Sequence, residues 1–213
     1  MSDITSFNVL QLDAIREVGN IGTGNAATAL SGLLSRMIHM DVPKVELVSI
    51  YELGEHYGDP LQIVGAVFVR STGNFGCSLI FIQNEEDADL MVELLLQQQF
   101  GGTYIPIGEI PEEIKDSALS EVGNIVLSSF LNAINVLLGT QHQISVPGVA
   151  HDMLSSILDV VASIYGQMGE TALLVNTELR VDGLEEGRKV SGHIILIPDP
   201  DALEMLLKKL KVI

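Results

Sequence analysis

The pentapeptide Glu17-Val18-Gly19-Asn20-Ile21 returns unchanged as Glu121-Val122-Gly123-Asn124-Ile125, 104 positions further along the chain. With this offset held and no gaps, residues 9–43 match residues 113–147 at 11 of 35 positions. An internal match of this kind indicates duplication of one structural unit, and a period near half the chain length argues against a solenoid of short repeats. The sequence therefore predicts two related halves.

Both halves contain the same order of predicted elements: a long helix, strands and a shorter helix. Apolar residues at helical spacing predict long helices over 7–38 and 111–140, and acidic residues ahead of apolar stretches predict shorter helices over 87–98 and 200–211. Runs rich in β-branched residues predict strands over 44–50, 62–70, 75–83, 172–180 and 189–197. The stretch 151–165 fits either a helix or a strand.

We therefore predict an α/β fold made of internally duplicated, pseudo-twofold-related helix–strands–helix halves. The two long helices are expected to pack on a shared, largely antiparallel sheet. A similarity between residues 76–82 and 192–197, at an offset of about 116, indicates that insertions lie in the loops. With 213 residues, 47% of them hydrophobic, the chain can bury a sizeable core. We expect a single domain over residues 1–213, built of two repeats at about 7–105 and 109–213.

The repeated glycines lie in the middle of the two long helices. Glycine in a helix interior costs about 1 kcal/mol relative to alanine, and close approach of another backbone is the usual compensation. We therefore expect the long helices to pack near Gly19 and Gly123. The apolar residues beside them are expected to serve packing, namely Val18, Ile21, Val122 and Ile125.

Composition and charge exclude several classes of partner. The chain has 28 acidic and 11 basic residues and a net charge of −17, whereas nucleic acids and anionic membranes bind clusters of Lys and Arg. No run of 18 uninterrupted apolar residues and no signal-peptide pattern occurs. The single cysteine, Cys77, lies in a predicted strand and is expected to be structural. We expect a cytoplasmic protein that binds neither nucleic acid nor membrane.

Three polar residues of the first long helix share one face. Asp13, Glu17 and Asn20 stand at positions i, i+4 and i+7, which places them within about 60° of one another around the helix axis. We call them the first motif. The second motif repeats this spacing with the residues Ser117, Glu121 and Asn124. Each asparagine is followed, 23 positions later, by a proline, namely Pro43 and Pro147.

Solvated polar faces are common on helices, so a single carboxylate here would carry little information. Recent duplication could also explain shared residues. However, the residues that follow the two pentapeptides differ, with Gly-Thr-Gly-Asn at 22–25 and Val-Leu-Ser-Ser at 126–129. Retention of a carboxylate and an amide at fixed spacing, while their neighbours diverged, favours a functional role.

The doubled Glu-x2-Asn pattern with its trailing proline resembles the CheC branch of the CheC, CheX and FliY phosphatase family, over essentially the whole chain. The resemblance implies hydrolysis of the aspartyl phosphate of the chemotaxis response regulator CheY. It implies four catalytic residues, Glu17, Asn20, Glu121 and Asn124, with the asparagines orienting an in-line water and the glutamates pairing with a lysine of the regulator. Asp13 and Ser117 are weaker candidates for partner contact. FliY-type members of the family add a further domain, which we do not expect in this chain.

The same resemblance implies that the protein needs no cofactor or metal of its own, because a divalent ion such as Mg²⁺ is expected on the regulator. It also implies binding to the receptor deamidase CheD, for which the sequence shows no motif. Since a duplicated chain already contains a pseudo-twofold pair, a monomer suffices. The alternative function is a non-catalytic chemotaxis or flagellar-switch scaffold that binds CheY or regulates CheD.

Two other signals are weighed and set aside. Residues 22–27 satisfy a Gly-x-Gly-x-x-Ala dinucleotide-binding pattern, but they lie inside a predicted helix instead of between a strand and a helix. The five histidines and the one cysteine show no spacing typical of a zinc site.

Overall fold

The structure, a computed structural model, describes residues 9–166, 171–184, 187–199 and 202–209. Its helices are α1 (Val9–Leu34), η1 (Ile50–His56), α2 (Glu85–Gln99), η2 (Ile107–Glu109), α3 (Glu112–Leu138), α4 (Leu154–Tyr165) and α5 (Ala202–Lys209), η1 and η2 being 3-10 helices. Its strands are β1 (Ile38–Ser49), β2 (Ile63–Gly73), β3 (Cys77–Asn84), β4 (His142–Ile144), β5 (Gly148–Met153), β6 (Thr171–Val181) and β7 (Val190–Pro198).

These elements confirm the predicted order in both halves, with a few differences. Helix α1 ends at Leu34 instead of residue 38, and the short strand β4 was not predicted. Strand β1 begins at Ile38, six residues before the predicted start at residue 44. The ambiguous stretch 151–165 is mostly helix α4, preceded by the end of β5. The outer ends of the helices predicted over 7–38 and 200–211 fall outside the described residues.

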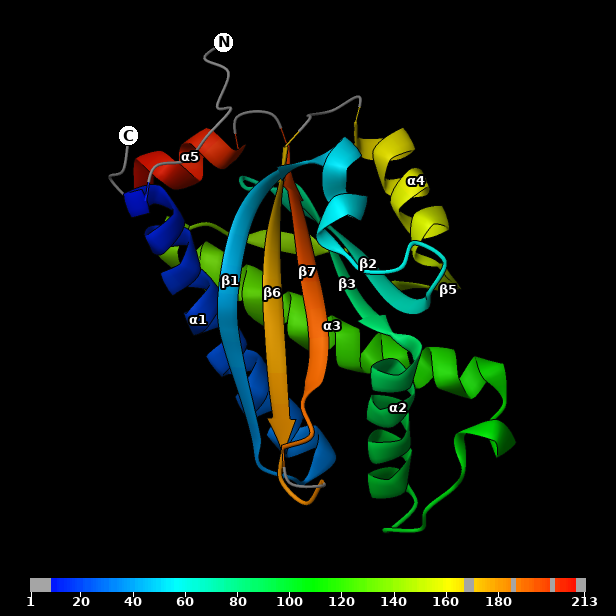
Figure 1. The fold of residues 1–213 in the computed structure, drawn as a ribbon. Helices are drawn as coiled ribbons and strands as arrows, with labels where there is room; N and C mark the ends of the chain where they lie inside the picture. The colour runs from blue at the N-terminus through cyan, green and yellow to red at the C-terminus, as the bar shows by residue number, and fades with distance from the viewer. Residues whose placement is uncertain (1–8, 167–170, 185–186, 200–201, 210–213) are drawn as a thin grey trace.

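The strands form one sheet in the order β1-β6-β7-β3-β2-β4, with β5 also paired to β2 (Figure 1). Every described pairing is antiparallel. The pair β3–β7 at the centre joins the two halves. The first strands of each half pair with the other half. Strand β1 of the first half pairs with β6 of the second, and β4 and β5 of the second half pair with β2 of the first. The halves are therefore interlocked through their backbone hydrogen bonds.

Each of the two repeated prolines lies at an irregularity in the outer strands. The register between β1 and β6 shifts between Asp41 and Lys44, which flank Val42 and Pro43. In the second half, Pro147 lies in the gap between β4 and β5. Proline cannot donate a ladder hydrogen bond, so strands accommodate it at edges and irregular positions. The prolines thus mark an equivalent break in both repeats.

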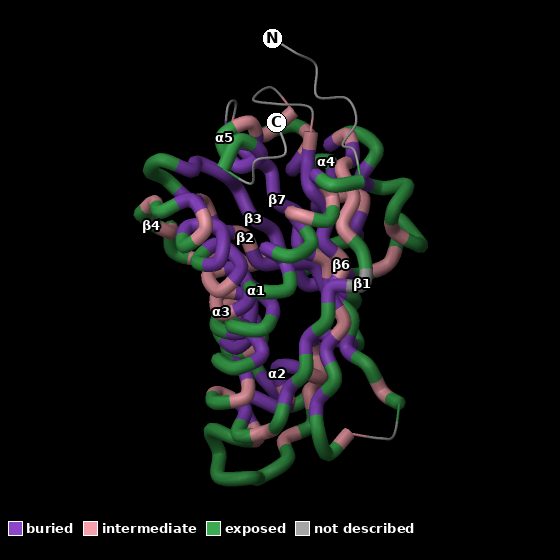
Figure 2. Tube along the Cα trace, turned by 90° about the vertical axis from the view of Figure 1, so that its left-hand side faces the viewer, coloured by how far each residue is buried: buried purple, intermediate pink, exposed green. Residues whose placement is uncertain are grey.

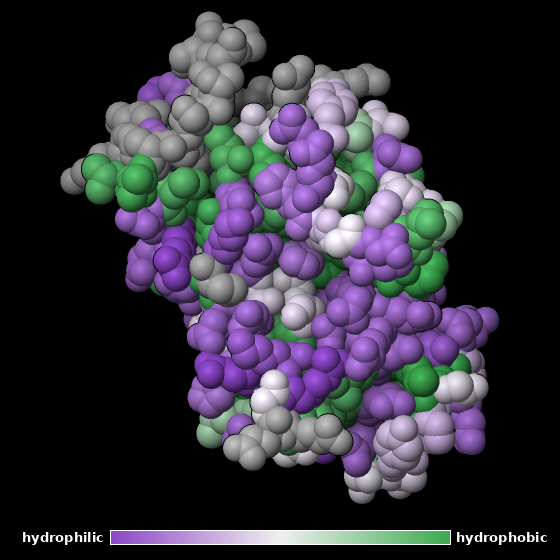
Figure 3. Space-filling view, in the orientation of Figure 1, coloured by the Kyte–Doolittle hydropathy of each residue, from purple (hydrophilic) through white to green (hydrophobic). Residues whose placement is uncertain are grey.

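The two faces of the sheet are covered unequally. Helices α1, α2, α3 and α5 bury one face in the larger apolar cluster, which includes Leu30, Phe81 and Val126. On the other face, η1 and α4 cover only one end, around Leu53 and Ile195. The rest of that face is largely hydrophilic over β1, β6 and β7 (Figure 3) and carries the ion pairs Arg180–Asp41, Lys189–Glu178 and Lys44–Glu46.

The long helices pack against each other near Gly19, as predicted, but not near Gly123. A Cβ at Gly22 would lie 2.8 Å from the Cα of Phe130, so the backbones approach there, one turn beyond Gly19. A Cβ at Gly19 would lie at ordinary contact distances, 3.6 Å from the side chain of Val42 on β1 and 3.7 Å from that of Phe130 on α3. Gly123 faces the sheet, where a Cβ would lie 2.5 Å from Val67 of β2. The two glycines are thus equivalent in sequence but not in packing.

Helix α3 is the one described helix that is long and apolar enough to cross a membrane. However, 61% of its most apolar stretch is buried inside the protein, against the sheet and the other helices. We therefore interpret α3 as a core helix, and the described residues contain no clear membrane span.

Candidate functional site

Helix α1 presents the first motif to solvent because its opposite face is anchored in the core. Ile15 and Val18 are 2% and 4% exposed, while the motif residues Asp13, Glu17 and Asn20 are all exposed. This division follows the 3.6-residue period of an amphipathic helix. Figure 2 shows buried and exposed positions alternating along α1.

Helix α3 presents the second motif in the same way. Ala118 and Val122 are buried, whereas Ser117 and Glu121 are exposed and Asn124 is half-buried. All six predicted site residues therefore reach the surface. The structure keeps each motif together on its own helix, and the two motifs lie on separate helices that cross beyond them in sequence.

The motif carboxylates have no counter-ion among the residues that the structure describes. In the described part of the chain, neither Glu17 nor Glu121 forms an ion pair. The exposed Arg16, next to Glu17, also forms no ion pair with a described residue. Each carboxylate is thus available to a cation supplied by another molecule.

The asparagines differ in their surroundings. The hydroxyl of Ser128 donates a 3.2 Å hydrogen bond to the side-chain oxygen of Asn124. The residue equivalent to Ser128 in the first repeat is Gly24, which has no side chain. Among the described residues, no hydrogen bond reaches the side chain of Asn20, although Thr23 Oγ1 donates to its main-chain oxygen at 3.2 Å.

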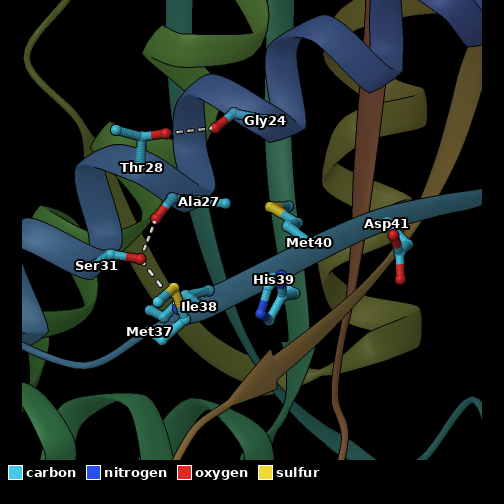
Figure 4. A pocket seen from close by; sticks show the side chains of 9 residues that line it. All are labelled: Gly24, Ala27, Thr28, Ser31, Met37, Ile38, His39, Met40 and Asp41. Carbon is cyan, nitrogen blue, oxygen red and sulfur yellow. Dashed lines mark hydrogen bonds between the residues drawn. The ribbon is translucent and has the colours of Figure 1, made fainter.

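A groove of about 410 Å³ lies on α1 just beyond the first motif (Figure 4). Gly24 and Thr28, one and two turns after Asn20, form its helical wall, and Met37 with the first residues of β1, 38–41, forms the other wall. Thr28 Oγ1 donates to the oxygen of Gly24 at 3.0 Å. Ser31 Oγ donates to the oxygen of Ala27 at 2.7 Å and accepts from the amide of Ile38 at 2.9 Å, which ties the helix to the strand.

One apolar neighbour of the motifs is placed differently from its prediction. Val18, Val122 and the partly buried Ile125 pack in the core as expected, but Ile21 is 51% exposed beside Asn20. The first motif thus has an exposed apolar residue at its edge. Sequence reasoning missed both Ile21 and Ser128. The divergence of residues 22–25 from 126–129 was the one available sign that the two surfaces differ.

The signals set aside in the sequence stay outside the site. Cys77 is fully buried, and burial raises the pKa of its thiol to about 12, so it is not a nucleophile. The Gly-x-Gly-x-x-Ala stretch at 22–27 lies inside α1 and not at a strand–helix turn. Within the described residues, no group of three or more His, Cys, Asp or Glu side chains is arranged to hold a metal ion.

Comparison with known proteins supports the duplication. The model of the CheC-like family matches this chain twice, over residues 10–47 and 114–151. The two matches start 104 residues apart, and each contains one motif and its trailing proline. The family pattern therefore corresponds to the repeat unit found within the sequence.

Relatives extend the similarity over the whole chain. CheY-P phosphatase CheC of Bacillus subtilis is 33% identical over 207 residues, which cover 97% of this chain and 96% of that protein. Flagellar motor switch phosphatase FliY of B. subtilis is 26% identical over 147 residues, which cover 69% of this chain and 37% of FliY. The crystal structure of Thermotoga maritima FliY superposes with a TM-score of 0.75 at 23% identity, over 98% of this chain and 99% of that one. Since one relative exceeds 30% identity over nearly its full length, this chain belongs to the CheC-like family.

Proposed function

We propose that this protein is a phosphatase that hydrolyses the aspartyl phosphate of the response regulator CheY. The observation that carries the proposal is the presence of two exposed Glu–Asn pairs at equivalent positions of α1 and α3. The printed functions of its CheC and FliY relatives support it. The enzyme is a hydrolase whose substrate is another folded protein.

The chemistry needs few groups from the phosphatase. An acyl phosphate is already activated, and the proposal assigns the divalent metal ion to the regulator. The remaining task is to hold a water in line with the phosphorus, and orientation alone can lower a barrier by several kcal/mol. The carboxamide of Asn20 or Asn124 both donates and accepts, so it can fix a water without acting as a base.

The glutamates anchor the complex. Glu17 and Glu121 are unpaired by any described cation, so each can accept a charge-assisted hydrogen bond from a lysine of the regulator. Such a bond contributes about 1.5–3 kcal/mol when it is shielded from water. Asp13 and Ser117, one turn earlier on the same faces, extend the contact with the partner. An exposed helix face suits insertion into the regulator's own active site.

Further parts of the proposal rest on family resemblance. We place the protein in the cytoplasm, which agrees with its single buried, unpaired cysteine. We also retain CheD as a partner and a monomer as the working state. Co-purification of CheD with this protein, and the molar mass of the protein alone in solution, test these two points.

The deciding experiment measures phosphate loss from purified, phosphorylated CheY. The intact protein is expected to accelerate it, and the double change Asn20→Ala with Asn124→Ala is expected to return the rate to that of CheY alone. A matched control changes Asn25 and Asn132 to Ala, because both are exposed asparagines of the same helices outside the motifs. The control is expected to keep full activity.

Two results would contradict the proposal. Full activity in the N20A/N124A variant would remove the asparagines from the site. An intact protein that binds CheY without accelerating phosphate loss would instead support the scaffold alternative.

A further inference from the structure

The hydroxyl of Ser128 is used in an unusual way for a serine inside a helix. Such hydroxyls commonly bond the main-chain carbonyl four residues earlier. Thr28 and Ser31 of α1 do this, donating to the oxygens of Gly24 and Ala27. Ser128 instead donates to the side-chain oxygen of Asn124, the residue four positions earlier, at 3.2 Å.

We propose that Ser128 is a positioning residue that holds the carboxamide of Asn124 ready for catalysis. The inference rests on the proposed function and deepens it for the second site. The carboxamide oxygen has two acceptor positions, so the bond from Ser128 occupies one and leaves the other for the attacking water. It also fixes the plane of the amide in advance. The side chain therefore loses less conformational entropy when the reactive complex forms.

Burial agrees with this role. Asn124 is half-buried on α3, whereas Asn20 is exposed on α1. At the position equivalent to Ser128, the first repeat has Gly24, and a Cβ built there would meet no atom within 4 Å. The first site therefore lacks the positioning hydroxyl, yet it has room for one.

The loss-of-function arm uses a parent in which only the second site works, made by Glu17→Ala and Asn20→Ala. In this parent, Ser128→Ala is expected to lower kcat roughly three- to tenfold with little change in KM, because one neutral hydrogen bond orders the amide. Ser128→Thr retains a hydroxyl and is expected to restore most of the rate. Ser129→Ala, a neighbouring serine outside the motif, is the matched control and is expected to match the parent.

The gain-of-function arm uses the reciprocal parent, Glu121→Ala with Asn124→Ala. There, Gly24→Ser is expected to raise kcat roughly three- to tenfold by supplying the missing hydroxyl. Gly24→Ala is its control, since it adds the Cβ and the helix propensity without the hydroxyl, and it is expected to leave kcat unchanged. A purely structural role for these positions would not produce a gain that depends on the hydroxyl.

The outcomes separate this inference from the proposed function. If the intact protein fails to exceed the intrinsic rate of CheY, the proposed function is wrong and the inference falls with it. If the intact protein is active but neither single-site parent is, the inference alone is overturned, because the two sites do not act independently. If the parents are active but S128A equals its parent, or G24S equals G24A, the inference alone is overturned. Should S128A lower the melting temperature of the protein, the G24S arm decides by itself, because it lies on the other helix.

Discussion

The outer faces of α1 and α3 carry the same Glu–Asn pair in different surroundings. Around Asn20 the face is open and charged, with Arg16 and the half-exposed Ile21 beside it. Around Asn124 the neighbours are serines, and one of them, Ser128, bonds the carboxamide. The pair is common to both repeats, while the groups that support it are not.

This difference shows what each face is suited to do. A loosely held amide on a charged, partly apolar surface gains from contacts that the partner supplies, whereas an amide held in advance gives up less conformational freedom on binding. We therefore expect the first motif to depend more on partner contacts and the second more on preorganisation. The first two predictions below test whether equivalent positions of the repeats have equivalent roles, and the last contrasts two positions of the central strands that are not equivalent.

The largest expected effect concerns the two repeated glycines. A Cβ at Gly123 would lie within 2.8 Å of three side-chain atoms of the fully buried Val67, so Gly123→Ala should lower the free energy of unfolding by about 2–3 kcal/mol. At Gly19 the nearest atom is 3.6 Å away. Gly19→Ala should therefore leave stability unchanged or raise it by up to about 1 kcal/mol through helix propensity.

Urea denaturation of both variants measures this contrast. Equal losses would mean that the helices sit on the sheet symmetrically, against the packing described above. A loss of stability in the Gly19 variant alone would contradict the close contact between Gly123 and β2.

The sequence predicted the repeat, the helix–strands–helix order and the antiparallel sheet because each is encoded locally. Period-3.6 and β-branched patterns describe single elements, and the Glu–Asn spacing fixes one face of one helix. It did not predict that Gly123 packs on β2 or that Gly22 marks the helix crossing. Those facts depend on how far each helix is rotated over the sheet, which local spacing does not contain.

A one-residue error in the second similarity has the same origin. Aligning residue 76 with residue 192 makes Cys77 equivalent to His193. However, Cys77 lies in the cluster under the long helices, whereas His193 lies on the same face of β7 as Ile195 and Ile197 of the opposite cluster. Since side chains alternate between faces along a strand, a shift of one residue exchanges the faces. Only the three-dimensional sheet reveals the correct register.

A smaller effect is expected when the two sites are disabled one at a time. Removing the second pair, by Glu121→Ala with Asn124→Ala, should leave roughly a fifth of the phosphatase rate, while removing the first pair should leave most of it. This difference between the two residual rates follows from the additional hydrogen bond at Asn124, which corresponds to a several-fold change in rate. Initial rates of phosphate loss from phosphorylated CheY measure it. Equal residual rates would show that the two faces work equally well despite their different neighbours.

The smallest expected effect is a difference in the pH dependence of stability between variants of the central strands β7 and β3. The ring of His193 on β7 packs edge-on against that of Tyr57, with 4.7 Å between the ring centroids, and its Nδ1 lies 2.8 Å from Asn176 Oδ1. Burial lowers the pKa of His193 below its ordinary 6.5. The unfolded chain therefore binds the proton first, and stability should fall as the pH drops below about 6.5.

His193→Gln removes this proton uptake, so its free energy of unfolding should decline less steeply than that of the intact protein between about pH 7.5 and 5.5. Cys77 on β3 supplies the control, because burial raises the pKa of its thiol to about 12 and it stays protonated over this range. Cys77→Ala should thus run parallel to the intact protein, whatever its absolute stability. If the plots of unfolding free energy against pH are parallel for all three proteins, the pKa of His193 is the same in the folded and unfolded states. That result would contradict the burial of His193 in the sheet.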